Sequence, residues 1–78
     1  MPLIELYQNV KFMVNFFDHN PPHFHVHHKG TDYKAAFSIA DCELIAGNKP
    51  DKRVKKIIDH WWLMNKDRLE AAWSEYCE

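Results

Sequence analysis

The sequence is poor in glycine and cysteine, and each scarcity removes a class of function. Its two glycines are Gly30 and Gly47. A phosphate-cradling loop needs several glycines close together, so nucleotide binding through such a loop is excluded. The two cysteines, Cys42 and Cys77, lie far apart and form no Cys-x-x-Cys pair. This usage fits a reducing compartment, so we expect a cytoplasmic protein without a disulfide framework.

Long apolar runs and a strong net charge are missing as well. No stretch approaches the about 18 consecutive apolar residues of a membrane span, and the N-terminus lacks the basic-then-apolar pattern of a secretory signal. The formal net charge of −1 argues against a general nucleic-acid coat, which needs a broadly basic surface. One short basic run fits either a solvated helix start or a patch that contacts DNA phosphates: Lys49, Lys52, Arg53, Lys55 and Lys56.

Hydrophobic and aromatic residues, by contrast, are plentiful. They make up 46% and 14% of the 78 residues, enough for one packed domain over residues 1–78. A chain this short lies near the lower limit for folding alone, so we expect a modest stability that a homodimer would increase. Apolar alternation before residue 47 and helical spacing after residue 50 divide the domain into a β-meander, 1–47, and a C-terminal helical region, 50–77.

The first part of the chain predicts an antiparallel meander. Strand-like alternation occurs in residues 3–7, 10–17, 23–29 and 32–39, and a further short strand fits within 41–47. Gly30-Thr31 has the composition of a two-residue type II′ turn, which sets Phe24 opposite Phe37. The same register, continued back across the Pro-Pro turn, sets Val14 beside Val26.

The remaining chain predicts a helix over residues 51–77. Pro50 or Asp51 suits its first turn, and Asn65-Lys66-Asp67 interrupts the apolar stripe, which predicts a kink or a division into two helices. Trp62 lies off the stripe and is expected at the sheet edge or in an interface. The predicted fold class is therefore α+β: a small antiparallel sheet, a meander of three to five strands, with one apolar face covered by the helix or kinked helix pair. The expected core is Val14, Phe16, Phe24, Val26, Ala35, Phe37, Ile39, Val54, Ile57, Ile58, Trp61 and Leu69.

Histidines gather around the Pro-Pro turn. Five of the six histidines fall within residues 18–28. Because side chains alternate along a strand, His23, His25 and His27 share one face, the face that the helix would leave bare. Ser38 shares this face. The candidate binding residues are Asn15, His19, His23, His25, His27 and Lys34.

These histidines support more than one chemistry. His23 and His25, joined by His19 from the turn and by the Asp18 carboxylate, could hold a divalent transition metal such as zinc, and a bound water could then be activated. Two imidazoles could also exchange protons near pH 7 as general acid and base. Adventitious metal capture, hydrogen bonds to the turn, or contacts to phosphates by protonated imidazoles are further explanations of the pattern.

Other reactive side chains give weaker signals. His28 is expected half-buried opposite Tyr33, and His60 is expected exposed on the helix. Cys42 has no basic neighbour in sequence, so nucleophilic catalysis by its thiol has little support.

The segment His19-Asn20-Pro21-Pro22-His23-Phe24-His25-Val26 resembles the signature of short prokaryotic proteins known as the domain of unknown function 4160 family. The resemblance spans nearly the whole chain, including the opening Met-Pro and the segment Arg68–Trp73. It favours His19, His23 and His25 as the site. The chain departs from the pattern at His27-His28, which puts a family-wide role for His27 in doubt, and at Trp61-Trp62.

The resemblance also implies a partner, because such proteins are often encoded beside another small protein, in an arrangement similar to toxin–antitoxin pairs. Our leading hypothesis is a small non-enzymatic binding module that acts through protein contacts. The alternatives are a metal- or histidine-dependent nuclease or hydrolase that uses His19, His23 and His25, and a DNA-binding regulator.

Overall fold

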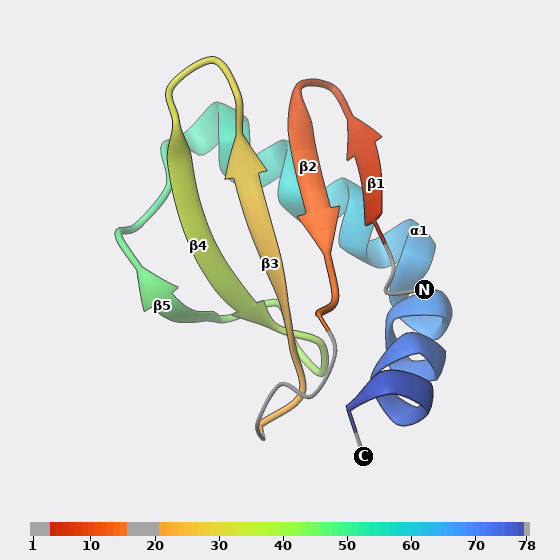
Figure 1. Ribbon diagram of the computed structural model, residues 1–78. Helices are drawn as coiled ribbons and strands as arrows, with labels where there is room; N and C mark the ends of the chain where they lie inside the picture. The colour runs from red at the N-terminus through yellow and green to blue at the C-terminus, as the bar shows by residue number, and fades with distance from the viewer. Residues whose placement is uncertain (1–3, 16–20, 78) are drawn as a thin grey trace.

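Five strands and one helix make up the computed structural model, which describes residues 4–15 and 21–77. All neighbouring strands are antiparallel and follow one another across the sheet in chain order. The helix lies across one face of the sheet, and the described elements leave the opposite face uncovered (Figure 1). The predicted α+β meander is confirmed. Its elements are β1 (Ile4–Tyr7), β2 (Val10–Met13), β3 (His23–His28), β4 (Tyr33–Ser38), β5 (Leu44–Gly47) and α1 (Lys52–Tyr76).

The β3–β4 hairpin has the predicted register, with Phe24 opposite Phe37, but not the predicted turn. The connection is a loop over residues 29–32, and its left-handed residue is Asp32 (φ 57°) rather than Gly30. Thr31 donates its backbone N–H (3.3 Å) and its hydroxyl (2.9 Å) to Nδ1 of His28, which closes the loop. Because a side chain closes this loop, a tight type II′ turn with a left-handed glycine is not required.

The register between β2 and β3 differs from the prediction by two residues. Phe12, rather than Val14, lies opposite Val26. β2 ends at Met13 instead of continuing to residue 17, so the connection to His23 is too long to set the register as a tight turn would. A shift of two residues keeps every side chain on its predicted face, because the strand repeat is two. The predicted core residue Phe16 lies outside the described residues.

The core lies between the sheet and α1. The Phe12 ring stacks on the Trp61 ring with centroids 4.0 Å apart, and Phe24 lies 6.1 Å from the same indole. The other predicted core residues that the structure describes are buried, except Ile57, which is half-buried at the margin of the core. The prediction omitted several buried residues: Val10, Phe12, Ala36, Cys42, Ala72 and Trp73.

The start of α1 and the kink in its middle are each explained by a particular polar residue in the sequence. Asp51 is the N-cap: its side-chain oxygen accepts from the Val54 backbone N–H at 2.8 Å. The predicted kink occurs at Asn65, whose φ of −123° and ψ of 15° are not helical. Buried Asn65 donates to the Trp61 carbonyl and accepts from Arg68, which in turn bonds Glu5 of β1 at 2.8 Å. The kink is therefore connected by hydrogen bonds to the edge of the sheet.

Trp62 lies at the sheet margin, one of the two positions expected for it. Its half-buried indole donates to the Ile39 carbonyl at 2.7 Å, and Lys66 lies over the ring. The Nε1–H of Trp61 has no acceptor among the described residues, so the central indole is held by packing alone. Within the described part of the chain, no helix is long and apolar enough to cross a membrane.

The Phe12–Trp61 stack should dominate stability. We expect Phe12→Leu to lower the free energy of unfolding by about 2 kcal/mol, because it removes both buried volume and an aromatic pair. Chemical denaturation followed by tryptophan fluorescence measures this loss. The exposed substitution Leu6→Ala on β1 should change it by less than about 0.5 kcal/mol. Equal effects of the two changes would contradict the central place given to the stack.

The hydrogen bond of the Asp51 N-cap makes a second, independent contribution to the stability of the fold. Asp51→Ala leaves the Val54 N–H without its acceptor and should cost about 1 kcal/mol of stability, whereas Asp51→Ser should retain most of it. Thermal unfolding of the three proteins by circular dichroism compares them. An alanine variant as stable as the wild type would show that water replaces the cap without loss.

Candidate functional site

The candidate site is the sheet surface that faces away from α1, which we call the outer face. Residues directly opposite each other in neighbouring strands share a face. Ile4 lies opposite Met13, Met13 opposite His25 and His25 opposite Ala36, so one row crosses four strands. A second row is Leu6, Lys11, His27 and Lys34. Among these described strand positions there are imidazoles, lysines and apolar side chains, and no carboxylate.

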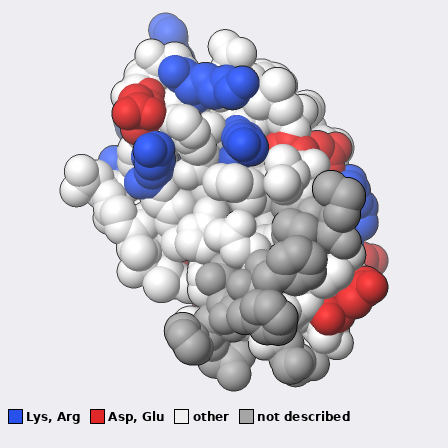
Figure 2. Space-filling view, in the orientation of Figure 1, with Lys and Arg blue, Asp and Glu red and all other residues white. Residues whose placement is uncertain are grey.

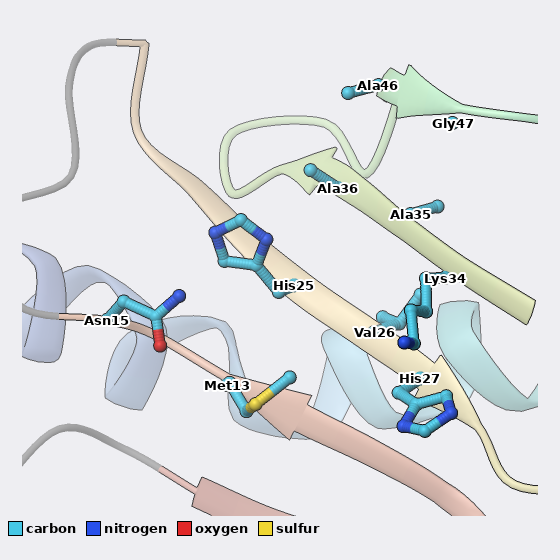
Figure 3. Close-up of a pocket in the computed structure, with 10 residues that line it drawn as sticks. All are labelled: Met13, Asn15, His25, Val26, His27, Lys34, Ala35, Ala36, Ala46 and Gly47. Atoms are coloured by element: carbon cyan, nitrogen blue, oxygen red, sulfur yellow. The ribbon is translucent and has the colours of Figure 1, made fainter.

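A hollow of about 370 Å³ lies in the outer face. Figure 3 shows His25 with Met13 of β2 and Asn15, which follows β2, on one side and Ala36 of β4 on the other, and it shows His27 and Lys34 side by side at the other end. The floor is apolar, and the polar groups stand around it. The lining residues are Met13, Asn15, His25, Val26, His27, Lys34, Ala35, Ala36, Ala46 and Gly47.

Small residues create this hollow. Ala36 lies opposite Ala46, and Ala35 lies opposite Gly47, so no side chain in these two pairs is larger than a methyl group. Gly47 has a φ of 96°, and a Cβ there would lie 2.7 Å from the Lys34 carbonyl oxygen. Only glycine fits this approach of β5 to β4. The sequence analysis missed Met13, Ala36, Ala46 and Gly47; the adjacent pairs of small residues in two neighbouring strands were the available signal.

At one end of the hollow, a histidine side chain hydrogen-bonds a carboxylate. His27 Nε2 lies 2.7 Å from Asp32 Oδ1 across the β3–β4 hairpin. The hydrogen bond from His27, with the nearby Lys34 and His27 charges, holds the pKa of the Asp32 carboxyl below its usual value. The Asp32 side chain therefore accepts from His27 as a carboxylate. On this face, Figure 2 shows the blue lysine and arginine atoms gathered toward the hairpin end and the middle without charge.

His23 and His25 lie together, as predicted. Their ring centroids are 4.9 Å apart, edge to face. His23 is less exposed than predicted for a bare face, because its ring also lies 5.2 Å from that of Trp73 at the end of α1. His23 Nδ1 donates to the Pro21 carbonyl at 2.8 Å, which fixes the orientation of the imidazole ring.

The predicted metal ligands are only partly described. His19 and Asp18 lie outside the described residues, so the prediction of a His19–His23–His25 metal set stays a prediction. Among residues 4–15 and 21–77, no group of three or more His, Cys, Asp or Glu side chains is arranged to hold a metal ion. His23 and His25 by themselves supply two ligands, fewer than a structural or catalytic zinc site requires.

The remaining candidates have structural roles. His28 is half-buried opposite Tyr33, and exposed His60 lies 6.1 Å from the Tyr7 ring, which agrees with both predictions. Lys55 of the basic run bonds Asp59 and the Cys42 carbonyl, whereas Lys49, Lys52, Arg53 and Lys56 are exposed. Ser38 accepts from the Ala40 backbone N–H through its hydroxyl.

Cys42 is not an activated nucleophile. Burial raises the pKa of the Cys42 thiol to about 12, and the nearby Lys55 ammonium, 4.0 Å from Sγ, does not offset it. The thiolate that nucleophilic chemistry needs is therefore scarce at neutral pH. The low support for a cysteine nucleophile in the sequence agrees with this geometry.

Comparison of the chain with protein-family models identifies its family. The family model described as "Domain of unknown function (DUF4160)" matches residues 9–74. No curated protein and no solved structure matches the chain. The matched range contains all six histidines and every residue that lines the hollow. Since the model covers most of the 78 residues, the chain belongs to the DUF4160 family.

Proposed function

We propose that this protein is a small cytoplasmic, non-enzymatic binding module whose site is the outer face of the sheet. The observation that carries the proposal is the hollow, which has an apolar floor and a rim of His25, His27, Lys34 and Asn15. An antiparallel sheet with one face in water normally alternates apolar side chains inward and polar side chains outward. Here apolar residues also point outward, which favours a partner that covers them.

The side chains of the outer face indicate the chemistry of that partner. Ile4 and Leu6 are 54% and 57% exposed, and they share the face with Met13 and the hollow. Lys11 and Lys34 supply positive charge on the same surface. A complementary partner surface therefore carries apolar side chains flanked by Asp or Glu.

The partner in this proposal is another small protein, encoded by the neighbouring gene in a pair of the toxin–antitoxin kind. The family resemblance supports this identity, and the mixed apolar and basic face supports a protein rather than a nucleic acid. Recognition of DNA phosphates would need the broadly basic surface that the net charge of −1 does not supply.

The test is calorimetric titration of the protein with the product of the neighbouring gene. We expect Lys34→Glu to weaken binding about tenfold and to reverse its salt dependence, because a carboxylate would then face the partner's carboxylates. Ala46→Leu, which fills the hollow without changing charge, should weaken binding as well.

Arg53→Glu is the matched control, because it makes the same charge change at an exposed position on the first turn of α1, away from the outer face. Its affinity should stay within about twofold of the wild type. Equal losses for Lys34→Glu and Arg53→Glu would contradict the assignment of the face. No heat of binding with wild-type protein would contradict the partner.

One observation favours a second candidate, a metal- or histidine-dependent nuclease or hydrolase. His23 Nδ1 donates to a backbone carbonyl while its ring meets that of His25. Histidines that bind metal commonly donate their other ring N–H in this way. A third ligand from His19 would complete this site.

Elemental analysis of untagged protein and cleavage of RNA and DNA test this second candidate. It requires about one transition-metal ion per chain and a rate that falls about 100-fold or more in His25→Ala. His60→Ala, which removes an exposed imidazole on the helix, should keep the full rate. Protein without stoichiometric metal and without His25-dependent turnover would remove the hydrolase and leave the binding module.

A further inference from the structure

A second unpartnered surface lies on α1, on the side opposite the sheet. Leu63 is 71% exposed, the highest value among the exposed large apolar side chains of the described residues, and Met64 beside it is 56% exposed. Both lie at the middle of the helix Lys52–Tyr76. They are remote from the outer face, because the core and the sheet stand between them and it (Figure 1).

Exposed basic residues lie on one side of this apolar pair along the helix, and exposed acidic residues lie on the other side. The half of α1 before Leu63 carries Lys52, Arg53 and Lys56, and the half after Met64 carries Asp67, Glu70 and Glu75. Within the described residues, none of these six takes part in an ion pair.

The other exposed charges on the helix are already paired. Asp59 pairs with Lys55, and Arg68 pairs with Glu5 of β1. What remains is a basic half and an acidic half with an apolar centre. Such a surface is complementary to itself when it is turned end for end.

We propose that two copies of this chain associate through α1, with the helices antiparallel and Leu63 and Met64 at the twofold axis. A twofold interface brings the same patch of both copies together, so residues before the centre of one helix meet residues after the centre of the other. With a rise of about 1.5 Å per residue, Lys56 lies ~11 Å to one side of the centre and Glu70 ~10 Å to the other. Each Lys56 therefore faces the Glu70 of the second copy.

Other positions agree with the same arrangement. His60 and Asp67 stand at equal distances from the centre and, seven residues apart, lie on one side of the helix, so antiparallel pairing brings the imidazole of one copy beside the carboxylate of the other. Parallel pairing would set Lys56 against Lys56 and Glu70 against Glu70, which is unfavourable. The exposed charges thus select one orientation.

This dimer goes beyond the proposed function and does not depend on it. Because α1 lies behind the sheet, pairing through its exposed side leaves both outer faces open and directed away from each other. Four large apolar side chains at the centre make a small interface, so we expect a dissociation constant on the order of 10–100 µM.

Sedimentation equilibrium over a concentration series tests the dimer. Lys56→Glu and Glu70→Lys should each weaken the dimer about tenfold, because each places like charges together twice. The double variant should return to within about threefold of the wild type. Leu63→Asp should abolish the dimer, while Ile4→Asp on the outer face should leave it unchanged.

A cross-linking experiment tests independently whether the two α1 helices of the dimer are antiparallel. In a Cys77→Ser background, Leu63→Cys should form a disulfide-linked dimer under mild oxidation, since the two copies of position 63 meet at the axis. Ser74→Cys should not, because antiparallel helices place its two copies roughly 30 Å apart.

Three results would overturn the proposal. These are a wild type that stays monomeric at ~1 mM, a dimer that Ile4→Asp dissociates and Leu63→Asp does not, and equal cross-linking at positions 63 and 74. Circular dichroism of each variant verifies that it is folded, and the charge swap changes no buried residue. Failure of the binding module in calorimetry leaves these results unaffected.

Discussion

The stacking of Trp61 on Phe12 is the contact on which the rest of this structure depends. The two rings lie 4.0 Å apart at the centre of the interface between α1 and the sheet. A domain of this size has one core, and one helix can cover only one face of a five-stranded sheet. Once the helix is seated on Phe12, the other face must stay open. The outer face, its histidines and its hollow are therefore consequences of how the core is packed.

A second constraint is the length of α1 compared with the sheet. A straight helix of 25 residues would be ~38 Å long and would extend past the strands. Asn65 breaks the helical geometry and supplies the hydrogen bonds that the break requires, to the Trp61 carbonyl and to Arg68. Arg68 continues this chain of contacts to Glu5, so the bend in the helix and the edge strand β1 hold each other in place. The exposed Leu63 and Met64 lie immediately before this kink, at the middle of the helix.

The two surfaces for which we propose partners differ in their physical character. The outer face combines a hollow with histidine and lysine side chains, which suits a different molecule with apolar and acidic groups. The exposed side of α1 has equal basic and acidic halves about an apolar centre, which suits a second copy of itself. Family membership identifies the chain as a DUF4160 protein without assigning an activity, so the chemistry of these surfaces carries the functional argument.

The sequence by itself determined the order of the strands, the face of each side chain, the start of the helix at Pro50 or Asp51 and a break near Asn65, because these follow from local periodicity and local hydrogen bonding. It also brought His23 and His25 onto one face. Tertiary structure alone decided the β2–β3 register, since the long proline-containing connection does not set it and the packing of Phe12 on Trp61 does. It likewise decided the contact of His23 with Trp73 and the hollow between β4 and β5, because both depend on residues distant in sequence. Small side chains such as Ala36 and Gly47 have no chemical signature of their own, and their role exists only where two strands meet.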